Sequence, residues 1–477
     1  MKKGLCVFLA LMMMLFACSL SAAEDEIAYD GSEVDVTIAL YERISNEQQA
    51  ALEYAVSEFN KLYPNIHVSW EHYSSLDYKY MHDLEEMFLY GGSAEYPGSI
   101  AWFQPDKTAL EEISVELMAL DSFIDSAGQV ARADGTSEAI GLTDEQKADF
   151  FEGFYQEGLQ FGDGQMRILP FSKYTDVMYY NKTVFDANGF TVPATWDEME
   201  SLLGQIAEYG SSRVAELGYY YFPLGYRSMG NLFLTMTEQL VTPYISASEP
   251  HFLFNTEENR AFVRRFHDWY QQGNITTTRL YGSIPAYAFV QPEYGALMIT
   301  AVDNTYCASR YIPAKQEDGS FSFEAGVAPI PQVDPANGKV YFQGVSLGIF
   351  HKSNEQEEIA SWLLVKFLAT NPDIQAEYAL ASGNLPVIKS AVETEKYADF
   401  LAKADGGDGL PALSAKVGLA QQDSFFSAPI FPGSCEAYNA VDKMFADALI
   451  MPDSEDTAAE IDALFEAAMA ECEASMQ

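Results

Sequence analysis

The chain has 477 residues, of which 48% are hydrophobic, and a formal charge of −43 at neutral pH. This length exceeds one ordinary domain and predicts two lobes, and the hydrophobic content suits packed cores rather than a disordered chain. A surface this acidic repels nucleic acid and anionic lipid headgroups, so neither is expected as a partner.

The N-terminus has the pattern of a secretory signal. The basic pair 2–3 precedes an apolar run, 5–17, that is too short to cross a bilayer as a helix. Two processing sites compete. One would remove 1–23 as a signal peptide, and the other is a lipobox-like sequence that would leave Cys18 as a lipidated first residue. Both predict export to the periplasm or the cell surface, and the second adds a lipid anchor.

The rest of the chain keeps three cysteines, Cys307, Cys435 and Cys472, so at least one thiol is unpaired. Neither these cysteines nor the six histidines have the spacing of a metal-binding motif. We therefore expect no metal and no cofactor.

The first part of the chain alternates strands and helices. Strands are expected at 34–41, 66–70 and 99–103, with helices at 46–63 and 76–90 between them. This order predicts a parallel, doubly wound sheet, and ligands of such sheets lie beyond the carboxyl ends of the strands. Tyr41 and Gln104 stand at two of these ends. Further on, we expect helices at 106–125 and 144–158 and an exposed loop at 126–144.

The most informative stretch is 169–198. Pro170 has no N–H to donate and is expected to stop any element that precedes it. The elements that should follow are a strand at 177–180, a helical turn at 183–188 that Gly189 ends, and a helix that begins with a capping box of Thr195 and Glu198.

Later elements are read from the same periodicities. Helices are expected from 196 to 209 and at 230–241, 257–273 and 354–369, and strands at 218–222, 294–300 and 340–350. The aromatic residues of 257–273 recur at helical spacing, which predicts that they lie in a core.

These motifs, in this order, resemble the extracellular solute-binding proteins of ABC importers, family 1. The family's "P…YYN…G…P.TW.E" corresponds to 169–198, its "F…G..AM" to 289–298, and its "P.P…GG…GylP" to 329–386, with Gln343-Gly344 where Gly-Gly is usual. The resemblance covers roughly 34–400. It implies an α/β fold of two lobes with a hinge and a central cleft, and a monomeric receptor that delivers a solute to ABC permease subunits.

The resemblance also implies that each lobe is discontinuous in sequence. The expected boundaries are 30–168 with 346–392 for the first lobe, and 172–342 with 395–477 for the second. The hinge is expected near Pro170-Phe171 and Gly344-Val345, where strands would cross between the lobes.

The branch of the family that this chain resembles most binds glycerophosphate compounds, and its ligand contacts carry over only in part. Its cleft Glu falls near Gln104, its cleft Ser near Tyr174, and the Tyr of "GYLP" at Asn384. Its phosphate-binding Arg falls within 428–433, which contains no Arg. We therefore expect a neutral sugar or other hydroxyl-rich ligand, while Arg227 keeps a glycerophosphodiester or glycerol-3-phosphate open. The candidate ligand contacts are Tyr41, Gln104, Tyr174, Tyr226, Asp303, Gln343 and Asn384.

Enzymatic readings find little support in the sequence. The stretch 344–348 matches G-x-S-x-G, but a nucleophile elbow needs a helix directly after the Ser, and strand-type residues follow Ser346. No catalytic residue is therefore expected. Two other classes stay open: a secreted carbohydrate-active enzyme that uses a carboxylate pair, and an adhesin or signalling receptor that reuses the fold.

Overall fold

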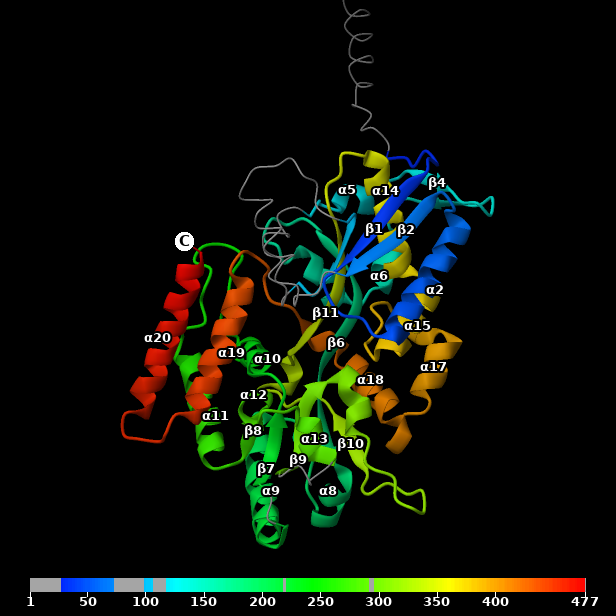
Figure 1. The fold of residues 1–477 in the computed structure, drawn as a ribbon. Helices are drawn as coiled ribbons and strands as arrows, with labels where there is room; N and C mark the ends of the chain where they lie inside the picture. The colour runs from blue at the N-terminus through cyan, green and yellow to red at the C-terminus, as the bar shows by residue number, and fades with distance from the viewer. Residues whose placement is uncertain (1–26, 73–97, 106–116, 218–219, 291–295, 477) are drawn as a thin grey trace, which may run out of the picture.

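The structure is a computed structural model that describes residues 27–72, 98–105, 117–217, 220–290 and 296–476. Figure 1 shows two lobes, one above the other, with the strands β6 (Ile168–Asn181) and β11 (Val340–Ile349) running between them. The helix expected at 76–90 and the lipidation site at Cys18 lie outside the described residues.

The sheet of the first lobe has the strand order β2–β1–β3–β11–β6. Its remaining strands are β1 (Val34–Leu40), β2 (Ile66–His72) and β3 (Ile100–Phe103). Strand β1 pairs in parallel with β2 and β3, so Ile38 lies opposite both Trp70 and Ile100. The predicted parallel arrangement of these three strands is confirmed.

The sheet of the second lobe continues from β6 in the order β6–β9–β7–β8, and β10 also pairs with β6. Its strands are β7 (Tyr220–Tyr226), β8 (Ile275–Thr277), β9 (Ala296–Asn304) and β10 (Ala325–Ala328), and the short β12 (Phe425–Phe426) pairs with β11. Because β7, β8 and β9 are parallel, their carboxyl ends meet at one edge.

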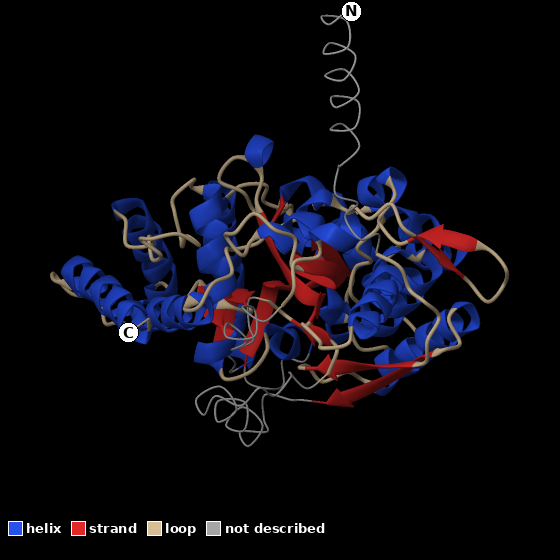
Figure 2. Ribbon diagram, turned by 90° about the horizontal axis from the view of Figure 1, so that it is seen from above, coloured by secondary structure: helices blue, strands red, loops and turns tan. Residues whose placement is uncertain are grey.

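Helices cover both sides of the strands, as the view from above shows (Figure 2). Around the first sheet the chain forms α2 (Asn46–Leu62), α5 (Asp121–Ile124), α6 (Asp144–Asp149), α7 (Glu152–Gln156), the 3₁₀ turn η1 (Glu157–Leu159), α14 (Glu355–Thr370) and α15 (Pro372–Ser382). After β6 come α8 (Lys182–Asn188), α9 (Trp196–Leu217), α10 (Met229–Gln239), α11 (Glu257–Gln271), α12 (Thr278–Tyr281) and α13 (Pro285–Val290). The C-terminal part adds α16 (Lys389–Glu393), α17 (Glu395–Leu401), α18 (Leu410–Ala420), the 3₁₀ turn η6 (Gln422–Ser424), α19 (Ser434–Ile450) and α20 (Thr457–Ser475).

Local capping signals of the sequence appear in the structure. The capping box of Thr195 and Glu198 opens α9, because the Glu198 N–H donates to Thr195 Oγ1 and the Glu198 carboxylate accepts from the Thr195 N–H, both at 3.2 Å. Gly189 ends α8 in the left-handed conformation with φ of 68°.

The prediction that Pro170 stops an element is wrong, because β6 runs through it from Ile168 to Asn181. Opposite this proline the ladder is irregular: Val345 pairs with Ser172, but Ser346 pairs with Pro170. Phe171 is therefore skipped in a bulge, and the missing N–H of a proline is tolerated at such a position.

Predictions for the segment between β3 and β6 are also corrected. The helix expected at 106–125 is reduced, within the described residues, to α5, and Leu117 forms an extended bridge with Phe350. The expected loop at 126–144 contains a hairpin of β4 (Gln129–Ala131) and β5 (Ser137–Ala139).

The helix expected at 144–158 is interrupted between α6 and α7. Phe150 and Phe151 have extended backbones there, and both side chains are buried in the core. Phe150 forms a bridge with Ile388, and the Phe151 N–H donates to the carbonyl of Val387, so tertiary pairing overrides the helical periodicity.

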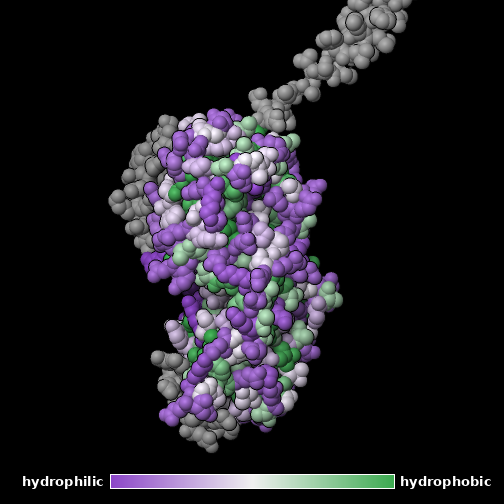
Figure 3. Space-filling view, turned by 90° about the vertical axis from the view of Figure 1, so that its right-hand side faces the viewer, coloured by the Kyte–Doolittle hydropathy of each residue, from purple (hydrophilic) through white to green (hydrophobic). Residues whose placement is uncertain are grey.

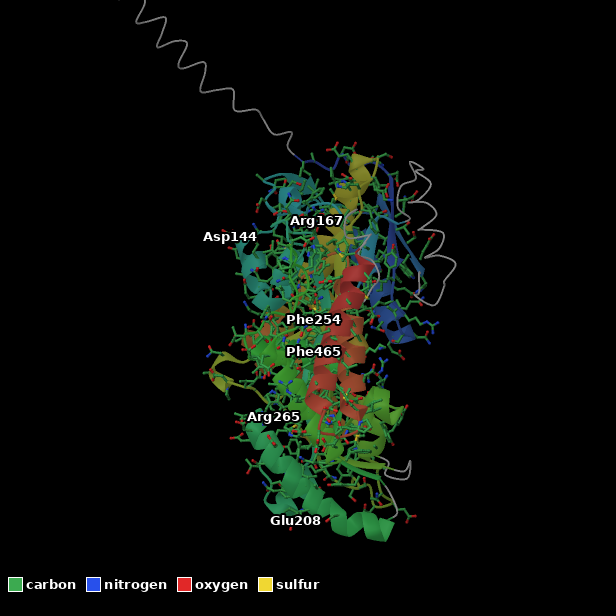
Figure 4. All side chains as sticks on the ribbon, turned by 90° about the vertical axis from the view of Figure 1, so that its left-hand side faces the viewer. Asp144, Arg167, Glu208, Phe254, Arg265 and Phe465 are labelled. Carbon is green, nitrogen blue, oxygen red and sulfur yellow. The ribbon has the colours of Figure 1, made fainter. Side chains whose placement is uncertain are left out.

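Aromatic residues form the core of the second lobe beside the C-terminal helices. The ring of Phe233 on α10 lies 6.2 Å from Phe254 and 6.1 Å from Phe445 and Phe465. Phe465 lies on α20, and Figure 4 labels it together with Phe254. The aromatic residues of α11 point into the same core, and Phe266 and Trp269 are buried as predicted.

The surface agrees with the acidic composition. The face in Figure 3 is mostly hydrophilic, and its outline narrows between the upper and lower lobes. Among the described helices, none combines the length and the apolar character needed to cross a membrane.

The strand crossing gives a test of backbone strain at Gly344, which has φ of +123° and would place a Cβ 2.3 Å from the Ser172 carbonyl oxygen. We expect Gly344→Ala to lower the free energy of unfolding by at least about 3 kcal/mol, because strain and clash add. Urea denaturation measures it. The matched control is Gly164→Ala, where φ is +75° and nothing lies within 4 Å. There we expect a loss of about 1 kcal/mol. Equal losses at the two positions would contradict the assignment of a strained crossing.

Candidate functional site

Where β6 and β11 cross between the lobes, they present a polar face. Successive side chains of a strand alternate between its two sides, so Ser172, Tyr174 and Asp176 point to the same side of β6. Gln343 on β11 is the register partner of Tyr174 and shares that side. We call these four residues the crossing face.

Two predicted site residues from other segments are bonded to the crossing face. The Tyr174 hydroxyl donates to Gln104 Oε1 at 3.1 Å, and Asn384 Nδ2 donates to Ser172 Oγ at 2.8 Å. Gln104 directly follows β3 and Asn384 follows α15, both in the first lobe. The structure thus brings Gln104, Tyr174, Gln343 and Asn384 together at the junction of the lobes.

An aromatic pair lies at the same junction. The ring of Tyr306 is 4.9 Å from that of Tyr174, at an interplanar angle of 73°. Tyr306 follows the carboxyl end of β9 and is half-buried, so the pair joins a residue of the crossing to a strand end of the second lobe. Aromatic rings of this kind offer flat apolar contact area together with a polar tip.

Two residues of the crossing face, Gln343 and Asp176, are hydrogen-bonded to buried amides of neighbouring elements. Asn231 Nδ2 donates to Gln343 Oε1 at 3.0 Å, and Asn304 Nδ2 donates to Asp176 Oδ1 at 2.7 Å. All four side chains are buried. Because buried polar groups are costly unless bonded, this network fixes the orientation of Gln343 and Asp176.

Tyr226 ends β7 at the edge of this network and is fully buried. Its hydroxyl has no hydrogen-bond partner among the described residues. Burial, and then the nearby Asp176 carboxylate, raise its pKa well above the usual value, so the hydroxyl stays protonated. Close by, the hydroxyls of Tyr438 and Ser228 are hydrogen-bonded at 2.8 Å, and Tyr438 also donates to Asn231 at 2.8 Å.

Asp303 and Arg227 form an ion pair at the ends of β9 and β7. Arg227 Nε lies 3.4 Å from Asp303 Oδ1, and the exposed fraction is 25% for the Arg227 side chain and 0% for Asp303. The Tyr311 hydroxyl donates to the other carboxylate oxygen at 2.9 Å. Burial raises the pKa of Asp303, and Arg227 opposes that shift.

Cys307 lies beside this pair. Burial, reinforced by the Asp303 carboxylate, raises the pKa of its thiol to about 12, so the thiol stays neutral. Arg227 Nη1 lies 3.7 Å from its sulfur. The other two cysteines of the body, Cys435 and Cys472, form no disulfide in the described part of the chain either.

Tyr41 lies apart from the crossing face. It packs with Phe103, Leu117 and Phe350 in an apolar cluster of the first lobe. Its assignment as a ligand contact stays a prediction. Ser346 is buried within β11 and has no helix directly after it, as expected for a residue that is not a nucleophile.

Sequence reasoning did not find Ser172, Asp176, Tyr306 or Asn231. The polar positions 172, 174 and 176 do alternate in the sequence, a signal that the assumed stop at Pro170 concealed. The contacts of Asn231 join segments far apart in the chain and leave no local pattern.

Two cavities lie elsewhere in the described structure. One, of about 430 Å³, is lined by Trp196, Phe262 and Arg265 on the second lobe. Its guanidinium is already paired, because Arg265 (Figure 4) donates to Asp197 and Glu200. The other, of about 570 Å³, lies beside β12. No group of His, Cys, Asp or Glu side chains suited to a metal ion occurs in the described parts of the chain.

Comparisons with known proteins show which family the chain resembles. A family model described as bacterial extracellular solute-binding protein matches residues 54–404. A protein of Brucella abortus (strain 2308), named as a binding protein, is 25% identical over 302 residues, which are 61% of this chain and 64% of that protein. The match therefore spans just under two thirds of the length of this relative.

Solved structures share the fold at low identity. The sugar-binding protein MalE of Xanthomonas citri superposes with a TM-score of 0.65 at 18% identity, over 92% of this chain and 98% of that chain. The cyclic alpha-maltosyl-1,6-maltose binding protein of Arthrobacter globiformis gives 0.63 at 19% identity, over 93% and 99%. UgpB of Mycobacterium tuberculosis, in complex with glycerophosphocholine, gives 0.63 at 18% identity, over 91% and 98%.

The ion pair of Arg227 and Asp303 predicts a pH-dependent stability. In Arg227→Met the buried carboxylate loses its cation, so its pKa in the folded state rises further above the unfolded value. Folding then takes up a proton, and the free energy of unfolding falls as the pH rises from the unfolded-state pKa of Asp303 to its folded-state pKa. We expect a loss of about 3 kcal/mol at about pH 8 and a smaller loss at about pH 5, measured by urea denaturation.

The double variant Arg227→Met/Asp303→Asn is the control. Since it has no carboxylate to ionise, it should recover most of the stability at the higher pH and lose the pH dependence. A loss in Arg227→Met that is the same at both pH values would contradict this account of the pair.

Proposed function

The chain belongs to the bacterial extracellular solute-binding proteins, and we propose that it is the receptor of an ABC importer for a sugar or another neutral, hydroxyl-rich molecule. It captures this solute between its lobes, performs no chemistry on it, and delivers it to permease subunits in the membrane. We propose that it acts as a monomer.

The crossing face is the observation that carries this proposal. Together with the neighbours that contact it, this face combines the amides of Gln104, Gln343 and Asn384 with the hydroxyls of Tyr174 and Ser172 and with the ring of Tyr306. Amides and hydroxyls both donate and accept hydrogen bonds, as sugar hydroxyls do. Aromatic rings supply apolar area for the C–H surfaces of a sugar.

The charges at the junction favour a neutral ligand. Arg227 is the partly buried cation beside Tyr306 and Cys307, and the buried Asp303 compensates it. The second cation near Cys307, Arg310, lies 3.8 Å from the sulfur but is exposed to water. A phosphate would have to compete with that carboxylate for the guanidinium. Because burying an anion without an uncompensated cation is costly, a neutral solute is favoured.

We propose that capture proceeds by hinge bending. The lobes would comprise 30–168 with 346–392 and 172–342 with 395–477, with the hinge at the crossing of β6 and β11. The support for this is that β11 pairs with β3 of one sheet and β6 with β9 of the other. A ligand shifts the equilibrium between open and closed lobes only by as much as it prefers the closed state.

A second candidate ligand is a glycerophosphodiester. The observation that favours it is the partly exposed guanidinium of Arg227, which would offer donors to a phosphate. The similarity in fold to UgpB, which was solved with glycerophosphocholine, is in line with this alternative.

A thermal-shift screen of the purified protein decides between the two. The panel consists of maltose, acarbose, tagatose and glycerophosphocholine. We expect a saccharide to raise the melting temperature, with about 2.7 kcal/mol of stabilisation at a hundredfold excess over its Kd. A shift with glycerophosphocholine and none with any saccharide favours the second candidate. Turnover of a saccharide by the protein would contradict the proposal that it only binds its ligand.

Variants of two residues that contact Tyr174 of the crossing face locate the site. Gln104→Ala and Tyr306→Ala should each weaken binding of the saccharide about tenfold, because each removes a polar or stacking contact. Tyr54→Ala is the control, since Tyr54 is 44% exposed on α2 of the first lobe. Affinities that are equal in all three variants would show that the ligand binds elsewhere.

We further propose that the exported chain is anchored by a lipid on Cys18. The support is the apolar run that ends in Leu-Phe-Ala-Cys. Cell fractionation tests it: the native protein should sediment with membranes, and Cys18→Ala should move it to the soluble fraction. Sedimentation of both forms would contradict lipidation at Cys18.

A further inference from the structure

The level at which β6 and β11 pass between the lobes contains a buried ion pair. The Lys173 side chain is 0% exposed, and its ammonium lies 2.5 Å from Glu157 Oε2. It also donates to the Gly344 carbonyl and to Ser346 Oγ, both at 2.9 Å. Ser346 in turn donates to the same Glu157 oxygen at 2.6 Å. The ammonium thus has three partners for its three donors. We call these four residues the Lys173 cluster.

The Lys173 cluster links three separate segments of the chain. Lys173 lies on β6, Gly344 and Ser346 lie on β11, and Glu157 lies on η1. Because Lys173 is adjacent to Tyr174 in a strand, its side chain points away from the crossing face. The cluster therefore holds the two strands together from the side opposite to the proposed ligand.

The same level is the least regular part of the strand ladder. The register of β11 against β6 shifts between Val345 and Ser346, and Gly344 has φ of +123°. A bulge leaves a residue unpaired and bends its strand locally. Bending between the lobes is therefore easiest here, next to the one ion pair described in this segment of the two strands.

Open volume lies on the side of the Lys173 cluster. The cavity of about 570 Å³ is lined by Glu152 and Gln156 of α7, by Glu238 of α10 and by Phe425 of β12. These elements come from both sides of the crossing. The lobes can therefore change their angle on this side without first unpacking a filled core.

We propose that Lys173 is a positioning residue for solute capture. Its cluster holds β6 to β11 at Lys173 and Gly344, so that the lobes rotate about this point of the crossing. During this rotation Ser172, Tyr174 and Gln343, on the other side of the strands, keep their spacing and bind the solute as one preformed set. This inference rests on the proposed function, in which the solute binds at the crossing face.

The test compares Lys173→Met with Lys366→Met. Lys366 is the matched control, because its side chain is 4% exposed, lies 3.4 Å from Glu138 and donates to the Ala139 carbonyl within the first lobe, away from the crossing. Both variants lose a buried lysine that is paired with a glutamate. Only the first loses a link between β6 and β11.

Electron–electron distance measurements on the ligand-free protein provide the main readout. Nitroxides are attached through Tyr54→Cys in the first lobe and Tyr287→Cys in the second, since these side chains are 44% and 49% exposed. The half-buried Cys435 is replaced by Ser in all samples. We expect Lys173→Met to broaden the distance distribution about twofold and Lys366→Met to leave it unchanged. An unchanged width in Lys173→Met, or equal broadening in both variants, would overturn the proposal.

Affinity for the best-binding compound of the panel gives the second readout. Lys173→Met should weaken binding about tenfold, because the crossing face is no longer held in one geometry. Lys366→Met should stay within about twofold of the native protein. Affinity losses that follow the loss of thermal stability in both variants would reduce Lys173 to a structural role.

A milder variant keeps the test decisive if Lys173→Met does not fold. Ser346→Ala removes one partner of the ammonium, and we expect a smaller broadening of the distance distribution in the same direction; no broadening would sink the proposal. If no compound of the panel binds the native protein, the proposed function fails. The distance measurements need no ligand, so they still decide whether Lys173 pins the crossing.

Discussion

The pairing of β6 with β11 is the interaction on which the rest of the structure depends. It runs from Ile168 opposite Gly348 to Thr175 opposite Phe342, and each strand then continues into a different sheet. One side of this ribbon carries polar groups at the junction of the lobes, and the other side buries Lys173 with Glu157. The alternation of side chains in a strand is what allows the polar side chains and the buried ion pair to occupy the same few residues.

Electrostatics divides the molecule into an acidic exterior and compensated pairs inside. The chain carries a formal charge of −43, yet the buried carboxylates of Glu157, Asp176 and Asp303 each have a cation or amide donors within reach. A carboxylate in a core is tolerated only with such partners. The polar groups described at the junction are therefore dipoles and paired charges.

Much of the fold could be predicted from the sequence because its signals are local. The capping box at Thr195 and the stop at Gly189 depend on residues within a few positions of one another. The parallel order of β1, β2 and β3 follows from the alternation of strands and helices along the chain. Predictions failed where distant segments decide the outcome. Pro170 is accommodated by a bulge against Ser346, and Phe151 leaves its helix to pair with Val387.

At the candidate site, too, the sequence did not predict the contacts that join distant segments. Gln104 stands at the end of an expected strand, and Tyr174, Gln343 and Asn384 are placed by correspondence with the family's motifs. The pairing of Arg227 with Asp303 and the contact of Tyr306 with Tyr174 are made by tertiary structure alone. Neither spacing nor periodicity contains that information.

The late position of β11 in the sequence affects how the chain folds while it is being synthesised. This strand completes the first sheet by pairing with β3, where Ile349 lies opposite Ile100, and it also supports β6 at the start of the second sheet. The first sheet cannot close until β11 has been synthesised, and pairings between such distant segments form slowly. A chain with this topology therefore stays partly unfolded until β11 has been synthesised.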